Sequence, residues 1–280
     1  MTHVFVSPHP DDAAFSCGGL IADLCARGEA VTIVTVFCGP GSLDYLTPFQ
    51  RLALGFGAAA PVSGANIADA EAPGAAPTPE RVMAVRRAED AAYASLVGAT
   101  VVFVKRPDAV FRGYEGDAQL MGPPRDDDPA PVEELRAALS RLQVERLYLP
   151  LSVGGHVDHR QARRAAIALL AEPDSPYRDR AWFYEDFPYS LKFGFERLDQ
   201  LDPEILPSLP AGVTLVPEYF ELGGTLIDRK LAGLRAYASQ LDRTFGGDDR
   251  VPGQVRERAA RVGELGRVGP AERYWRVIKG

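Results

Sequence analysis

Short apolar runs rich in β-branched and aromatic residues alternate with longer segments of helical periodicity along most of the chain. The runs lie near residues 3–7, 30–37, 100–104, 146–151 and 181–186. Their side chains are apolar at successive positions, as expected of strands that are covered on both faces. We therefore predict that these five runs form strands of a largely parallel sheet.

Segments with apolar residues at helical spacing separate these runs. They cover residues 11–28, 79–98, 131–142 and 156–171, and a further one covers 226–241. Pro79 and Gly98 stand at the two ends of the second segment, which is typical of helix termini. The alternation predicts an α/β fold, a Rossmann-like three-layer domain with a mostly parallel sheet and a site at the carboxyl ends of the strands.

The length of the chain and its pattern predict a single domain over residues 1–280. Residues 55–79 are mostly Gly, Ala and Pro and lack the large apolar side chains that pack a core. We expect a long loop there, at the mouth of the site, because it follows the second strand. From about residue 187 the alternation weakens, which predicts a less regular C-terminal part.

Composition and charge restrict the partners. Hydrophobic residues make up 46% of the chain and charged residues 25%, as in ordinary globular proteins. A net charge of −7 argues against nucleic acid or an anionic membrane as the partner, since both favour clustered Lys and Arg. A neutral or cationic small molecule fits better, and a homo-oligomer is compatible with the sequence.

The beginning of the chain and its cysteines indicate the compartment. The first residues lack a secretory pattern, and no apolar stretch is long enough to span a membrane, so we expect a cytoplasmic protein. The spacing of the three cysteines matches neither a zinc site nor a disulfide framework. We expect all three to be reduced.

Three of the four histidines fall directly after two predicted strands. His9 lies in "HPDD", and His156 and His159 lie in "HVDH". Taken alone, Asp11 or Asp12 is well explained as a helix N-cap, and a lone buried histidine is usually a core residue. Together the two stretches offer two imidazoles and a carboxylate to one cation and leave a coordination position open, which is the pattern of a catalytic zinc site.

These motifs resemble the HPDD and HxDH motifs of the PIG-L/LmbE family of zinc-dependent deacetylases, which remove acetyl groups from N-acetylated amino sugars. The resemblance extends to "VRRAEDAAYASLVGA" at 85–99, which looks like the Arg-x-x-Glu helix of the family. It also extends to "FYEDFPY" at 183–189 and "KLAGLRAYASQL" at 230–241. It therefore covers most of the chain.

The resemblance implies one Zn²⁺ ion held by His9, Asp12 and His159. It also implies that Asp11 is the general base. Many members have a glutamate directly after the aspartate pair, and this chain has Ala13. The difference leaves the zinc ligands untouched and bears on the surroundings of the aspartates and on the substrate.

Further roles follow from the same resemblance. His156 is expected over the reacting carbonyl, with Asp158 orienting and polarising it. Arg86 falls where the family has an arginine that contacts substrate. Glu185 and Asp186, after the strand predicted at 181–186, either accept hydrogen bonds from sugar hydroxyls or form an acidic strand end in solvent.

Amide hydrolysis suits these residues. Zinc bound by two neutral imidazoles and one carboxylate keeps a net positive charge and activates a water molecule. Asp11 is free to take the proton of that water, because neighbouring side chains diverge, and either Asp11 or His156 protonates the leaving amine. The leading interpretation is a zinc-dependent deacetylase of an N-acetylated amino sugar or glycoside. A thiol-conjugate amidase of the mycothiol type and a non-catalytic sugar- or nucleotide-binding module are the alternatives.

Overall fold

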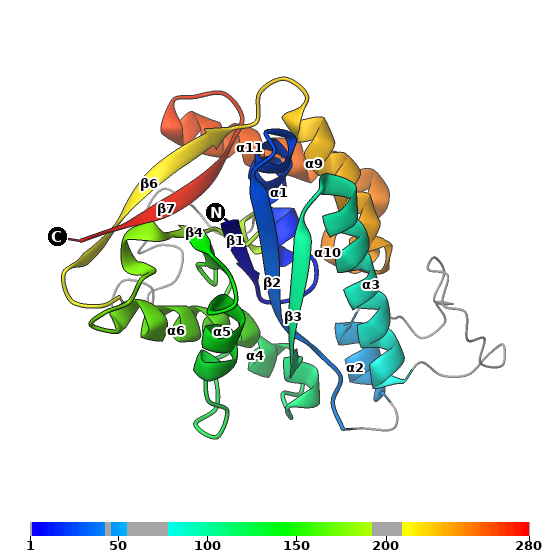
Figure 1. Cartoon of the computed structure of the whole chain (residues 1–280). Helices are drawn as coiled ribbons and strands as arrows, with labels where there is room; N and C mark the ends of the chain where they lie inside the picture. The colour runs from blue at the N-terminus through cyan, green and yellow to red at the C-terminus, as the bar shows by residue number, and fades with distance from the viewer. Residues whose placement is uncertain (1, 43–45, 55–77, 192–208, 280) are drawn as a thin grey trace.

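A seven-stranded sheet forms the centre of the protein (Figure 1), with the strand order β3-β2-β1-β4-β5-β7-β6. The computed structural model describes residues 2–42, 46–54, 78–191 and 209–279. In chain order the strands are β1 (Thr2–Ser7), β2 (Ala30–Gly39), β3 (Thr100–Pro107), β4 (Val144–Pro150), β5 (Ala181–Tyr184), β6 (Val213–Glu221) and β7 (Ala271–Lys279).

The first five strands are parallel, and the last two are not. β1 pairs with β2 and β4, β2 with β3, and β4 with β5, all in parallel register. β7 runs antiparallel to both β5 and β6. The predicted strands and the mostly parallel sheet are therefore confirmed, whereas β6 and β7 were not predicted.

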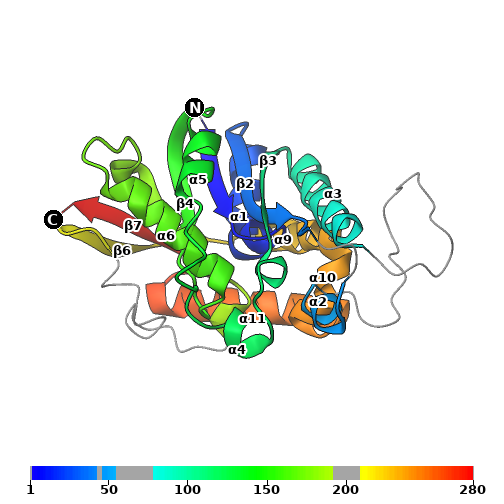
Figure 2. The same ribbon diagram turned by 90° about the horizontal axis from the view of Figure 1, so that it is seen from below.

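Helices cover both faces of the sheet, which gives the predicted three layers (Figures 1 and 2). Helices α5 and α6 pack on one face, and α1, α3, α9, α10 and α11 lie on the other. Their bounds, with those of the remaining helices, are α1 (Asp12–Ala26), α2 (Pro48–Ala53), α3 (Pro79–Val97), α4 (Asp117–Leu120), α5 (Val132–Leu139), α6 (Val157–Ala171), α9 (Leu226–Leu234), α10 (Ala238–Phe245) and α11 (Val251–Gly266). Short 3-10 turns are η1 (Ala109–Phe111), η2 (Arg178–Arg180), η3 (Tyr189–Leu191), η4 (Arg235–Tyr237) and η5 (Asp248–Arg250).

The apolar runs of the sequence are explained by burial on both faces. In β1, Val4 and Val6 belong to the core under α5 and α6, while Phe5 between them belongs to the core under α1. Successive side chains of a strand point to opposite faces, so a strand covered on both sides must be apolar throughout. Burying each such side chain contributes roughly 1.5 to 3 kcal/mol.

The C-terminal part is more regular than the sequence pattern indicates. From Val213 onward the chain forms two strands and three helices among the described residues. The helix predicted over 226–241 is divided by the 3-10 turn Arg235–Tyr237 into α9 and α10. Most of the loop predicted at 55–79 lies outside the described residues; Thr78 caps α3, which begins at Pro79.

A buried ionic cluster joins the C-terminal part to the parallel part. Glu272 of β7 accepts the backbone N–H groups of Gly19 and Leu20 at 2.8 and 3.0 Å. The same carboxylate binds Lys230 Nζ at 2.8 Å. A side chain at position 19 has no room, since a Cβ there would lie 2.1 Å from Leu222 Cδ2. The glycine is therefore explained by close packing of helix α1.

Candidate metal centre and active site

Turns that follow two neighbouring parallel strands meet at one edge of the sheet. The turn after β1 carries His9, Asp11 and Asp12, and the connection after β4 leads through His156 to His159 in the first turn of α6. Because β1 and β4 are adjacent and parallel, their carboxyl ends bring the two motifs together. The site therefore lies where the strand pattern predicted it.

The backbone after β1 keeps the two aspartates out of helix capping. Asp11 stands at the N-cap position of α1 but makes no capping hydrogen bond, and its φ of 113° is strained for a residue other than glycine. Ser7 Oγ accepts the N–H of Ala13 at 3.0 Å instead. Asp11 therefore occupies the N-cap position without the capping hydrogen bond that this interpretation requires, and both carboxylates line the cavity.

The three residues expected to hold zinc lie together. Asp12 Oδ2 is 3.2 Å from His9 Nδ1 and 3.2 Å from His159 Nε2. Two ligand atoms bound to one tetrahedral zinc ion lie about 3.4 Å apart, so each of these two distances fits. Nitrogens of His9, His156 and His159 also lie within 4.8 Å of one another. In the described part of the chain, the buried Nε2 atom of His159 has no hydrogen-bond partner. A buried polar atom without a partner is costly unless it faces a cation.

Buried carboxylates make this place favourable for positive charge. Burial lowers the pKa of His9, but its bonds to Asp12 and Asp158 outweigh that effect and raise it to about 9. The pKa of His159 is likewise held well above its usual value by Asp12 and Asp186, against the effect of burial. Carboxylates that stabilise two imidazolium ions also stabilise a divalent cation, which takes the place of the protons. These residues therefore fit a divalent metal.

A second carboxylate orients each of the two imidazoles. Asp186 Oδ1 lies 2.6 Å from His159 Nδ1. Asp158 Oδ2 lies 2.9 Å from His9 Nε2. Bonds of this kind fix the ring tautomer and direct the other nitrogen toward a metal. The other nitrogen of each ring faces Asp12.

Asp158 differs from its prediction, because its side chain does not bind His156. Its carboxylate accepts the N–H of Ala109 at 2.9 Å and Arg112 Nη2 at 2.6 Å, in addition to the contact with His9. Only its backbone N–H reaches His156, as a cap of helix α6. The partners of Asp158 come from the segments after β1 and β3, so spacing within "HVDH" could not indicate them.

Glu185 and Asp186 are both buried. Neither is among the described residues that line the cavity next to His9, Asp11 and Asp12. Asp186 lies against His159. Glu185 accepts hydrogen bonds from Arg273 and from Trp275 Nε1, at 2.6 and 2.8 Å, inside the C-terminal part. The two side chains point in opposite directions, as adjacent residues of an extended chain do. The structure therefore supports neither alternative given for these residues, the contact with substrate or the acidic strand end in solvent.

Asp11 lies between the candidate metal donors and Arg86. Arg86 Nη2 is 3.4 Å from Asp11 Oδ2, and its Nη1 is 3.6 Å from Asp108 Oδ2. Burial raises the pKa of Asp11 to about 8, with Arg86 opposing the rise and Asp12 adding to it. A carboxyl group with a pKa near neutrality is suited to proton transfer. Arg86 reaches the site from helix α3, and its contact with substrate stays a prediction.

His156 faces the cavity as a neutral imidazole. Its Nδ1 accepts the N–H of Asp158 at 3.2 Å, so its Nε2 carries the ring proton. Burial and the charge of His9 hold its pKa well below the usual range. Its ring centre lies 5.0 Å from that of His9 and 5.4 Å from that of His159. The residue is therefore placed to donate a hydrogen bond without carrying a charge.

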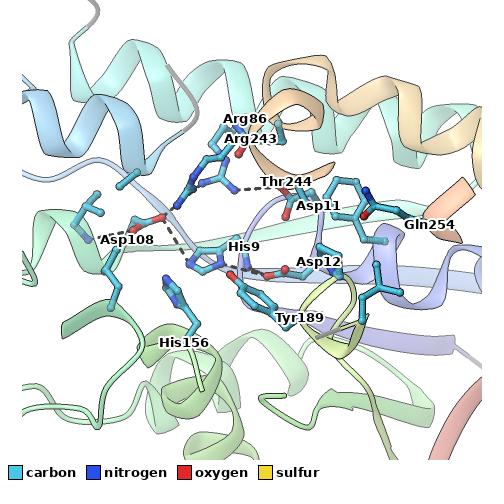
Figure 3. Close-up of a pocket in the computed structure, with 17 residues that line it drawn as sticks. His9, Asp11, Asp12, Arg86, Asp108, His156, Tyr189, Arg243, Thr244 and Gln254 are labelled. Carbon is cyan, nitrogen blue, oxygen red and sulfur yellow. Dashed lines mark hydrogen bonds and ion pairs between the residues drawn. The ribbon is translucent and has the colours of Figure 1, made fainter. Parts of the chain in front are cut away.

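A cavity of about 260 Å³ opens above these groups (Figure 3). Its floor is formed by His9, Asp11, Asp12 and His156, and one wall is apolar, with Ala53, Val110 and Leu120. A further wall comes from α10 and the start of α11, and consists of Gln240, Arg243, Thr244 and Gln254.

Sequence reasoning missed two parts of this cavity. Asp108 directly follows β3, so the rule that found His9, a polar residue behind a strand, also applied to it. The wall from α10 and α11 had no such signal, because its residues lie on helices and do not follow a predicted strand.

The match to the family extends over most of the parallel part. Residues 4–170 match the PIG-L family, described as GlcNAc-PI de-N-acetylase. The 2'-N-acetylparomamine deacetylase of Streptomyces fradiae is 31% identical over 246 residues, which are 85% of this chain and 73% of the relative. The 1D-myo-inositol 2-acetamido-2-deoxy-alpha-D-glucopyranoside deacetylase of Corynebacterium glutamicum (strain R) is 27% identical over 248 residues, which are 85% of this chain and 74% of the relative.

Solved structures show the same fold. The crystal structure of the zinc-inhibited form of a teicoplanin deacetylase has a TM-score of 0.73 and 20% identity, and the match covers 100% of this chain and 99% of that one. With its two motifs joined at one edge of a parallel sheet, and with the match over residues 4–170, this chain belongs to the PIG-L family.

Proposed function

We propose that this protein is a zinc-dependent hydrolase that removes the acetyl group from the nitrogen of an N-acetylated amino sugar, or of a glycoside that carries one. One observation carries the proposal: Asp12 Oδ2 lies 3.2 Å from a nitrogen of both His9 and His159, with Asp11 beside it on the cavity. Both relatives named above are deacetylases of N-acetylated sugars by name.

The residues of the chain itself orient the reactants and move the protons. His9, Asp12 and His159 are the residues that would hold zinc, which when bound supplies a Lewis acid that activates water and polarises the acyl oxygen. Asp11 accepts a proton from the water that attacks the acyl carbon. When the carbon–nitrogen bond breaks, the same carboxyl group gives this proton to the nitrogen, and the products are acetate and a free amine.

His156 stabilises the charge that develops on the acyl oxygen. Its Nε2–H faces the cavity, because its Nδ1 is occupied by the N–H of Asp158. One such donor contributes about 3 to 4 kcal/mol to stabilising the transition state. Arg86 binds Asp11 and holds it in place. These roles distinguish an enzyme from a binding module, which needs no proton acceptor.

The experiment is an assay of amine release by the zinc-loaded protein from a panel of N-acetylated amino sugars and their glycosides. We expect equal amounts of acetate and amine, loss of the reaction after chelation and its return with zinc. Release of amine that survives removal of the metal, or no release from any member of the panel, contradicts the proposal. Thiol-conjugate substrates belong in the panel because they test the nearest alternative.

The setting of the enzyme is proposed on the same basis. Its partner is a small molecule, and among the described residues no helix is long and apolar enough to cross a lipid bilayer. A cytoplasmic location stays a prediction.

A further inference from the structure

Arg243 is the cation of the cavity wall that the family match does not reach. It lies on α10, beyond the matched residues 4–170, and its side chain is exposed at the cavity. No carboxylate of the described residues pairs with its guanidinium group, nor does any described hydrogen-bond acceptor. Figure 3 shows it above His9 and Asp12, beside Thr244.

The other arginine of the cavity is already committed. Arg86 is buried and lies against the carboxylates of Asp11 and Asp108. The guanidinium group of Arg86 is therefore already paired with carboxylates of the protein before any ligand binds. Arg243 has no carboxylate partner among the described residues, so its five N–H donors are available to a molecule that enters the cavity.

Polar groups beside Arg243 are also open to a ligand. Gln254 donates its Nε2 hydrogen to Phe245 O at 2.9 Å, which leaves its Oε1 as an acceptor. Thr244 lies next to Arg243 in the chain and lines the same wall. This wall therefore presents polar side chains to the cavity.

The charge at this wall differs from that of the whole chain. The net charge of −7 is a sum over the sequence, and the carboxylates of the cavity floor face Arg86, the imidazoles and the candidate metal position. The charge of Arg243 reaches into the cavity, since it opposes the rise that burial causes in the pKa of Tyr189. An anion at the wall meets an unpaired positive charge there.

We propose that Arg243, with Thr244 beside it, binds a carboxylate or phosphate group on the part of the substrate beyond the N-acetylated sugar. A guanidinium group binds such oxyanions through two parallel charge-assisted hydrogen bonds. This inference rests on the proposed function and names the substrate class: N-acetylated glycosides that carry an acidic group. It departs from the neutral or cationic ligand that the net charge alone indicated.

The test compares two glycosides, one with a carboxylate and one with that carboxylate methylated to a neutral ester. The zinc-loaded protein is assayed with the para-carboxyphenyl glycoside of N-acetylglucosamine and with its neutral methyl ester. N-acetylglucosamine phosphorylated at its anomeric oxygen is the phosphate arm and shows which oxyanion is preferred. We expect Arg243→Gln to lower the ratio of kcat/KM for acid over ester about tenfold, chiefly through KM, and Arg243→Lys to restore part of it.

The control is Arg235→Gln, which removes an exposed arginine of the neighbouring turn η4 that does not line the cavity. It should leave the ratio of acid over ester unchanged. The effect of Arg243 should also shrink at high salt, because exposed charges are screened. An equal loss with both glycosides, or an unchanged ratio in Arg243→Gln, overturns the inference.

Direct binding separates this inference from the proposed function. Calorimetry with the carboxyphenyl glycoside measures affinity whether or not the compound is hydrolysed. If the wild type releases no amine but Arg243→Gln binds the acid about tenfold more weakly, the proposed function fails and the oxyanion site stands. If the affinity for the acid is the same in both proteins, the oxyanion site fails.

Discussion

The parallel part of the molecule and its C-terminal part contribute to the cavity in different ways. Residues of the first, within 4–170, place carboxylates and imidazoles at the carboxyl ends of parallel strands, where each is buried and bonded to another. Residues 213–279 form an antiparallel pair of strands and three helices, and they close the cavity from the side. Their polar groups at the cavity, such as Arg243 and Thr244, are more exposed.

This difference separates chemistry from selection of the substrate. Reactive groups need fixed geometry, which strand ends and buried bonds provide. The wall formed by α10 and α11 needs only to present side chains to a substrate that enters the cavity. The two parts remain one unit because buried hydrogen bonds join them. Glu272 of β7 accepts the N–H of Gly19 in helix α1, and the hydroxyl of Tyr237 donates to Asp90. Substitutions on either side of this junction should therefore have separable effects.

The largest effect is expected from His159→Ala. Removing this imidazole leaves zinc two protein ligands, so the protein should lose most of its bound metal and at least about a thousandfold in hydrolysis. Elemental analysis and steady-state rates on one N-acetyl sugar measure both. His156→Ala is the control, since it should keep the metal and lose mainly kcat. Full metal content in His159→Ala would refute the assigned ligand set.

Glu272→Ala should break the junction and spare the chemistry of the site. Its carboxylate is the buried partner of Lys230 and of two backbone N–H groups of α1. Leaving this lysine unpaired should cost about 3 to 5 kcal/mol in the free energy of unfolding, measured by denaturant titration. The double variant Glu272→Gln with Lys230→Met should recover part of the loss. Wild-type stability in Glu272→Ala would show that the cluster does not join the two parts.

Asp90 gives the junction a dependence on pH. It is buried and accepts hydrogen bonds from Thr35 and Tyr237, yet burial raises its pKa to about 6 from a usual 3.8. The folded state then holds the proton more tightly than the unfolded state, so this group contributes stability at low pH that is lost as the pH rises through about 6. The full difference in pKa between the folded and unfolded states corresponds to about 3 kcal/mol in the free energy of unfolding.

The measurement is the free energy of unfolding of wild type and Asp90→Asn from about pH 4 to pH 7. Asparagine does not titrate, so the wild type should lose stability relative to the variant as the pH rises. A difference that stays constant over this range would show that Asp90 has an ordinary pKa.

The adjacent residues Glu185 and Asp186 provide the finest comparison. Asp186→Asn should weaken zinc affinity by about 10- to 100-fold, because it removes the carboxylate that orients His159. Glu185→Gln should leave zinc affinity unchanged and lower stability, since its partners Arg273 and Trp275 belong to the C-terminal part. Chelator competition measures the affinity. An equal loss of affinity in both variants would contradict the opposite orientation of the two side chains.

The sequence predicted the parallel part because its signals are local. Burial on both faces makes each of its strands apolar throughout, as Phe5 between Val4 and Val6 illustrates. His9 and His159 were found because the strands they follow were visible. β6 was not found because it is an edge strand with many exposed side chains and a proline, Pro217.

The partners of individual side chains were harder to predict, because they come from distant segments. Asp158 was assigned to His156, its neighbour in the sequence, but binds His9 and Arg112. Residue spacing also could not show whether Glu185 or Asp186 faces the site, since that depends on where β5 ends and on β7 beside it. The order of helices and strands could therefore be predicted from the sequence, whereas the side-chain contacts between them could not.

One carboxylate of the pair in "HPDD" is expected to hold the metal and the other to move the proton. Asp11→Asn keeps the shape of the side chain but cannot accept a proton. The decisive measurement is zinc content together with kcat for this variant on one N-acetyl sugar. The account predicts zinc close to the wild-type level and a loss of about 10²- to 10⁴-fold in kcat. Loss of zinc as complete as in His159→Ala would contradict it, because Asp11 would then be a ligand.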